Sequence, residues 1–140
     1  MSDKAQSTHL PGDPEQWVRD LAAIWKAHDG VRAAQGYTED AVLHWGPGRR
    51  QSGAALRERP ARWFAYASDL EIDKEYVAHT DDCIVTTWRS AYTDPETGDR
   101  MQERGIETFR FENGLIREQH AWQHSWKEGE DAAVGDFSTD

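Results

Sequence analysis

The chain has 140 residues with 26 acidic and 16 basic side chains, and its formal net charge is −10. This length fits one domain with a sizeable core. The acidic balance argues against nucleic acid or an anionic membrane as a partner, because phosphate binding depends on clustered Lys and Arg. The single Cys83 excludes an internal disulfide and a multi-cysteine zinc site. No apolar run approaches the ~20 residues of a membrane span and no signal-peptide pattern is present, so we expect a cytoplasmic protein.

The two ends of the chain differ from its middle. Residues 128–140 contain five acidic side chains and no basic one, and both ends are rich in small and polar residues. We expect residues 1–13 and 128–140 to be flexible segments whose charged side chains keep them soluble. Residues 14–127 are then expected to form the single folded domain.

Helices are expected in the first half of the chain. Asp13 followed by Pro14 is typical of a helix start, and large apolar side chains then recur at helical spacing. The pattern predicts a helix from residue 14 to Asp29-Gly30. Shorter helical patterns cover residues 31–36 and 53–67, and Pro60 allows a kink or a break in the last of these.

Extended segments dominate the second half. Strands are expected at residues 41–45, 49–52, 70–78, 83–92, 101–111 and 115–122, with residue 126 as an alternative end of the last strand. Residues 38–40 are expected to form a polar turn. Asn113-Gly114 is a strong hairpin signal, because both residues tolerate positive φ. Helices followed by an antiparallel meander predict an α+β fold with the helices on one face of a curved sheet.

The strand before the Asn113-Gly114 turn contains an unexpected acid. Glu107 alternates in phase with Phe109 and Phe111, so all three side chains share the face that should be buried. The carboxylate therefore either lies at the wet end of the sheet or lines a pocket.

Three short motifs resemble the SnoaL-like branch of the nuclear-transport-factor-two-like superfamily. They are Ala27-His-Asp-Gly30, Tyr37-Thr-Glu-Asp-Ala-Val42 and Phe109-Arg-Phe-Glu-Asn-Gly-Leu-Ile116. The resemblance implies a cone: a strongly curved antiparallel or mixed sheet wrapped around N-terminal helices, with an internal pocket. The superfamily includes polyketide cyclases, ketosteroid isomerases, dehydratases and epoxide hydrolases, together with non-catalytic binders and dimerisation modules, so the fold does not choose the function.

The resemblance also implies which catalytic positions are kept. The general base and the oxyanion-hole tyrosine of ketosteroid isomerases correspond to Trp45 and about Leu21 here, and their protonated oxyanion-hole aspartic acid corresponds to Glu107. The proposed acid/base aspartate of the cyclases falls near Ala121. One acidic position therefore survives, and neither machinery is complete.

The inward faces implied by this fold predict a ligand-binding pocket. Its expected lining residues are Trp25, Trp45, Trp63, Thr86, Trp88, Ser90, Phe109 and Gln119. Large aromatic walls with few polar groups suit an apolar or aromatic small molecule. The alternative interpretation is that the tryptophans simply fill the cone as core.

Glu107 and His44 are the candidate catalytic residues. A carboxyl walled in by aromatic rings is expected to have a raised pKa, as a general acid requires. The alternative is a Glu107 that is hydrated at the pocket mouth or paired with Arg89, Arg104 or Arg110. His44 is either a base or, as the alternation of its strand favours, a hydrogen-bonded partner on the other face.

No metal or cofactor is expected. His120 and His124 are four residues apart, but no third ligand is evident, and no glycine pattern suggests a nucleotide site. An outward face containing His120 and Trp122 suits a homodimer interface. We therefore expect a cofactor-free isomerase, cyclase or dehydratase acting on an apolar or aromatic metabolite. The alternatives are a non-catalytic hydrophobic-ligand-binding protein and a dimerisation module.

Overall fold

The computed structural model describes residues 9–130. Most of the two predicted flexible segments, residues 1–8 and 131–140, therefore lies outside the described residues. Within the described range, none of the helices has both the length and the apolar character that crossing a membrane requires.

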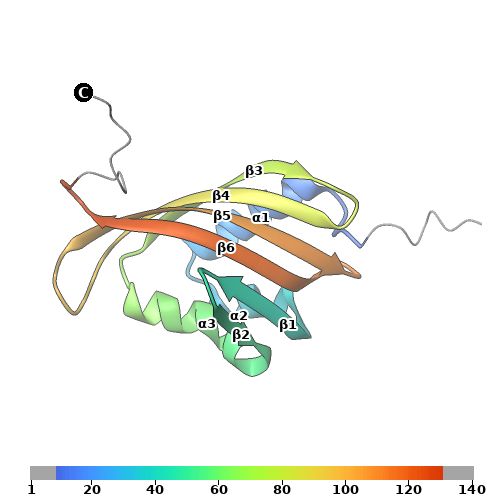
Figure 1. The fold of residues 1–140 in the computed structure, drawn as a ribbon, viewed down its shortest axis with the longest axis horizontal. Coiled ribbons are helices and arrows are strands. Elements are labelled where there is room, and N and C mark those ends of the chain that lie inside the picture. The colour runs from blue at the N-terminus through green and yellow to red at the C-terminus, as the bar shows by residue number, and fades with distance from the viewer. Residues whose placement is uncertain (1–8, 131–140) are drawn as a thin grey trace, which may run out of the picture.

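The structure is an α+β fold with one six-stranded sheet. The helices are α1 (Pro14–Lys26), α2 (Gly30–Gln35) and α3 (Gly53–Tyr66), and the strands are β1 (Tyr37–Trp45), β2 (Arg49–Ser52), β3 (Glu71–His79), β4 (Cys83–Thr93), β5 (Arg100–Glu112) and β6 (Leu115–Lys127). The strand order is β2-β1-β6-β5-β4-β3. All neighbouring pairs are antiparallel except β1 and β6. Figure 1 shows the long strands β3–β6 as one curved sheet, which confirms the predicted mixed, curved architecture.

The first helix begins as predicted and ends earlier. The side chain of Asp13 accepts hydrogen bonds from the backbone amides of Glu15 and Gln16, at 3.0 and 3.4 Å. The helix stops at Lys26, not at Asp29-Gly30, because His28 adopts a left-handed conformation with φ of 55°. Asp29 then caps α2 by accepting from the Arg32 amide at 3.0 Å.

Two other local predictions concern the turn at residues 38–40 and the possible break of a helix at Pro60. The predicted polar turn at residues 38–40 is wrong, because these residues belong to β1. Tyr37 pairs with Ile116 of β6 and Val42 pairs with Glu118, with a register shift between them. Sheet pairing on both sides of the polar stretch keeps it extended. The helix α3 continues past Pro60, which is buried.

The β5–β6 hairpin forms at the expected place. Asn113 and Gly114 both have positive φ, of 51° and 83°, as the turn requires. Along β5 the side chains of Glu107, Phe109 and Phe111 are all buried. The alternation read from the sequence is thus confirmed for this strand.

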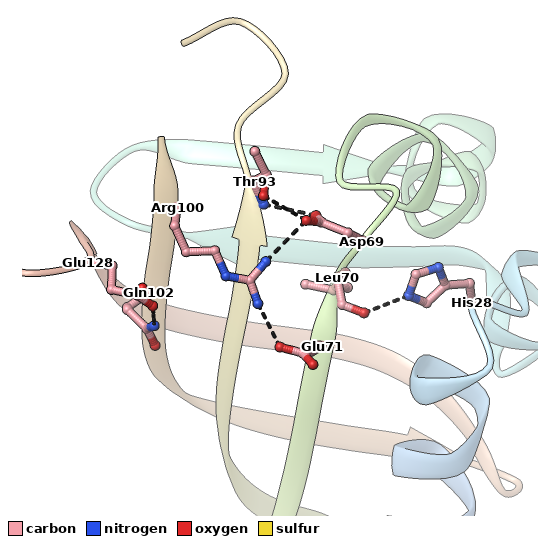
Figure 2. A network of polar contacts seen from close by, with 8 residues as sticks. All are labelled: His28, Asp69, Leu70, Glu71, Thr93, Arg100, Gln102 and Glu128. Carbon is pink, nitrogen blue, oxygen red and sulfur yellow. Dashed lines mark hydrogen bonds and ion pairs between the residues drawn. The ribbon is translucent and has the colours of Figure 1, made fainter. Parts of the chain in front are cut away.

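Polar contacts at one end of the sheet involve the segments that follow α1 and α3 (Figure 2). Asp69, between α3 and β3, accepts from the amide and hydroxyl of Thr93 at 2.8 and 2.7 Å and from Arg100 at 3.1 Å. Hydrogen bonding to Thr93 lowers the pKa of Asp69 below its ordinary value. Arg100 also donates to Glu71 at 2.6 Å. The ring of His28 contacts the Leu70 carbonyl at 2.9 Å, so the segment between α1 and α2 is tied to the start of β3.

Candidate functional site

Glu107 lies inside the fold and is held by three donors. Its side chain is 7% exposed. Lys74 Nζ donates to Oε2 at 2.9 Å and Thr86 Oγ1 donates to the same oxygen at 3.2 Å. Gln119 Nε2 donates to Oε1 at 2.8 Å. Such convergence of donors suits a carboxylate with a fixed orientation.

Lys74 is the partner that the sequence interpretation missed. None of Arg89, Arg104 and Arg110, the expected partners, makes this contact, and the Lys74 side chain is only 3% exposed. Its ammonium lies 4.7 Å from the centre of the Trp25 ring and 5.2 Å from that of Trp88, so two indole faces stabilise its charge. A signal was present in the sequence, because Lys74 alternates along β3 with the acidic Asp73 and Glu75 and therefore points to the opposite face.

A hydrogen-bond chain continues from Glu107 to the first strand. Tyr37 Oη donates to Gln119 Oε1 at 2.6 Å, while the amide nitrogen of Gln119 donates to Glu107. Burial, together with the negative charge of Glu107, raises the pKa of Tyr37 above its ordinary value. Tyr37 therefore stays a protonated donor, which fixes the orientation of the Gln119 amide.

A second polar group lies farther along β5. Glu103 is buried and accepts hydrogen bonds from Ser90 at 3.0 Å, Ser125 at 3.1 Å and Gln123 at 3.3 Å. Arg59 of α3 lies 4.5 Å from the centre of the Trp45 ring. Burial lowers the pKa of Arg59, while the charges of Tyr37, Glu107 and Glu103 oppose that shift.

Two cavities adjoin the Lys74–Glu107 pair. One has a volume of about 140 Å³ and lies towards α1. The other, of about 130 Å³, lies towards α3 and is lined by Arg59 and Glu103. Both are lined by the same five side chains, namely Trp25, Tyr37, Lys74, Glu107 and Gln119. The polar chain therefore lies between two small spaces whose walls combine aromatic, aliphatic and charged side chains.

The predicted lining residues are only partly brought together. Trp25 and Gln119 line both cavities, Phe109 lines the first, and Trp63 and Trp88 line the second. Thr86 and Ser90 lie behind the cavities as donors to Glu107 and Glu103. Trp45 packs instead against the cluster of Ala41, Leu43 and Leu56. The sequence interpretation did not place Tyr37, Arg59 and Glu103 among the lining residues.

The position of Trp88 depends on a glycine across the strand pair. Trp88 is the register partner of Gly105 on β5. A Cβ atom at Gly105 would overlap the six-membered ring of the Trp88 indole. The missing side chain thus provides the space in which this wall of the cavity lies.

His44 lies outside these cavities. It alternates along β1 with Leu43 and Trp45, both of which pack into a core cluster, so its side chain points to the opposite face of the sheet. There it stacks on His120 with 4.6 Å between ring centres. The structure therefore does not bring His44 to Glu107, and the second predicted catalytic residue has no place in the pocket.

A larger and more open hollow, of about 710 Å³, lies on that opposite face. It is lined by Asp73, Glu75, Thr87, Trp88, Arg89, Arg104, Gly105, Ile106, Trp122, Gln123 and His124. Its polar groups are mostly exposed and do not converge on one point. The smaller cavities are the better candidate for chemistry, because buried acid, base and amide groups meet there.

Comparisons with known proteins place this geometry in a family. A sequence profile described as SnoaL-like domain matches residues 18–119. No curated protein matches the chain at a significant level. Similar solved structures include a protein from Mesorhizobium loti described as a SnoaL-like polyketide cyclase, with 22% identity, a TM-score of 0.60, and 76% of this chain and 95% of that chain covered.

Two further structures share the fold. The epoxide hydrolase/cyclase-like enzyme SalBIII, with a role in pyran ring formation in polyether salinomycin, has 18% identity and a TM-score of 0.63 over 78% of this chain and 92% of its own. An NTF2-like protein of unknown function from Cytophaga hutchinsonii has 15% identity and a TM-score of 0.64 over 79% and 99%. At these identities the likeness shows the fold alone.

Proposed function

Because this chain belongs to the SnoaL-like domain family, we propose that it is a cofactor-free enzyme of isomerase, cyclase or dehydratase type. The observation that supports the proposal best is the carboxylate of Glu107, which is buried, fixed in orientation and placed between two cavities. A base in such a position can take a proton from a bound molecule without competition from water.

The size of the cavities limits the substrate. Each is smaller than the roughly 300 Å³ at which ligand pockets usually begin. A ring-sized ligand must therefore occupy both spaces or displace a wall between them. The walls of indole and phenyl rings favour a compact apolar or aromatic metabolite with one or two polar groups.

The polar groups have separate roles in this proposal. The Glu107 carboxylate removes a proton from carbon or oxygen of the ligand, and the electron pair of the broken bond stays on the ligand. Negative charge that develops on a ligand oxygen is stabilised by the cations Lys74 and Arg59, both of which line the cavity near α3. The same carboxyl returns the proton to a different atom in an isomerisation, or to a leaving hydroxyl in a dehydration.

A binding protein without catalysis is the second candidate. It is favoured by the same contacts, because Lys74, Thr86 and Gln119 already occupy both carboxylate oxygens of Glu107. In that case the network forms the polar floor of a pocket that holds a hydrophobic metabolite. The two candidates differ in turnover and not in affinity.

The test begins with tryptophan fluorescence titrated against aromatic and polycyclic compounds, since indole rings line both cavities. Compounds that bind are then incubated with the protein and followed by mass spectrometry and chromatography for isomers or loss of water. Glu107→Gln is expected to bind the ligand and to lose turnover about 10²–10⁴-fold, the usual contribution of a general acid or base.

Two further variants keep this test decisive. Glu107→Asp retains the charge opposite Lys74 but moves the carboxylate away from the ligand. Turnover should fall about 10²-fold, because a misplacement of about 1 Å is enough for such a loss. Glu112→Gln alters an exposed acid on the same strand that lines neither cavity, and it should keep turnover. If a substrate is converted and Glu107→Gln converts it as fast as the wild type, Glu107 is not the catalytic group. Ligands that bind and are never converted would favour the binding protein.

A further inference from the structure

A cluster of potential metal ligands lies on the sheet face opposite the cavities. β1 and β6 are neighbouring interior strands, and their parallel register pairs His44 with His120. Glu118 precedes His120 by two residues on β6 and therefore points to the same face. His44 is therefore brought to Glu118 and His120 from more than 70 positions away in the sequence. Both strands have a hydrogen-bonded neighbour on each side, so the backbone that carries the three side chains is held in place.

The distances approach those of a coordination site. His44 Nε2 lies 3.5 Å from Glu118 Oε2. One ligand atom from each of the three residues can be chosen so that all lie within 4.8 Å of one another. Ligands bound at about 2.0–2.2 Å in a tetrahedral zinc site stand roughly 3.3–3.5 Å apart. The His44–Glu118 pair already has this spacing. Closing the site requires the His120 ring to turn from its position between the rings of His44 and Trp122.

The two imidazoles are available to a metal ion. His44 and His120 stack with their rings 13° from parallel. Among residues 9–130, no hydrogen bond to either ring competes with the contact from Glu118. All three residues are partly exposed, so an ion can enter from solvent and complete its coordination with water.

We propose that His44, Glu118 and His120 bind a divalent transition-metal ion, with zinc as the reference case. Two imidazoles and one carboxylate suit zinc, copper or nickel and not the oxygen-preferring magnesium or calcium. The register partner of His44 on β2 is the exposed Arg50, and this nearby cation lowers the affinity for a metal ion. The site is independent of the pocket and of the function proposed for it.

The test uses the tag-free full chain and Zn²⁺ alone, in isothermal titration calorimetry. One ion per chain is expected. His44→Ala and His120→Ala should each weaken binding at least about tenfold, which corresponds to ~1.4 kcal/mol. In parallel, Co²⁺ should give visible absorption bands in the wild type that disappear in both variants.

His124→Ala is the matched control, because His124 lies four residues after His120 on the same face of β6. It should bind Zn²⁺ like the wild type, and circular dichroism should show every variant folded. Three outcomes would overturn the site: no saturable binding, affinities unchanged in His44→Ala and His120→Ala, or a stoichiometry of one ion per two chains.

Discussion

Lys74 brings a positive charge beside the rings of Trp25 and Trp88 and next to the acid that the pocket is built around. Removing one partner of a buried ion pair leaves the other uncompensated, whereas replacing both with apolar groups is often nearly neutral. At the scale of single residues, this pair is therefore a sensitive point of the structure. The buried charge of Lys74 also explains why an acid is tolerated on the same face as two phenylalanines.

We predict that Lys74→Met lowers the free energy of unfolding by about 3–5 kcal/mol, because the Glu107 carboxylate loses its ammonium partner in the interior. The double variant Lys74→Met/Glu107→Leu should be more stable than Lys74→Met alone. Chemical denaturation of the two single variants and the double variant gives the coupling between the sites. Losses that simply add in the double variant would show that the pair is energetically unimportant.

At the scale of elements, the strand pair β4–β5 shapes the cavity near α3. Trp88 and Gly105 face each other across this pair, and the indole occupies the space that a side chain at position 105 would fill. A glycine inside a strand lowers the local stability of β5. In return, it leaves room for the large aromatic side chain of Trp88 next to Lys74. Neither strand could hold the ring in this place alone.

We predict that Gly105→Ala destabilises the fold by about 1–3 kcal/mol, the usual range for overpacking, and displaces the Trp88 ring. Near-ultraviolet circular dichroism reports the indole environment, and chemical denaturation reports the stability. In a Trp88→Ala background the same glycine substitution should cost much less, because the overlapping atoms are gone. An equal cost in both backgrounds would mean that another contact excludes the side chain at position 105.

At the scale of the whole molecule, the face opposite the cavities is the candidate for self-association. Ile106 and Trp122 are register partners there and are 40% and 50% exposed. The hollow around them is lined by Asp73 and Glu75 on β3 and by arginines on the next two strands. A patch with an apolar centre and charges of both signs can complement itself across a two-fold axis.

We predict that the protein is a homodimer through the patch of Ile106 and Trp122, not through the cluster of His44, Glu118 and His120, and that Trp122→Asp shifts it towards the monomer. Light scattering combined with size-exclusion chromatography measures the mass. Leu115→Asp is the control, because Leu115 is also 40% exposed but lies at the β5–β6 turn. A wild-type monomer, or a Trp122→Asp variant that stays dimeric, would contradict the prediction.

Much of the fold follows from local patterns in the sequence. The Asp13-Pro14 helix start, the Asn113-Gly114 hairpin and the alternation along β5 depend on neighbouring residues, and each is found in the structure. Local patterns failed where distant pairing decided the outcome. Residues 38–40 carry turn-like chemistry, yet they belong to β1, which pairs with β6 at Tyr37 before them and at Val42 after them.

The sequence by itself determined that Glu107 shares a face with Phe109 and Phe111, because alternation along a strand is a property of the strand alone. Only the tertiary structure decided that Lys74 is its partner, that His44 faces away from it, and that the space beside it is divided into two small cavities. The sequence likewise could not predict that His44 lies close to Glu118 and His120. Such contacts join strands that lie far apart along the chain, and their register depends on how the entire sheet pairs and bends over its helices.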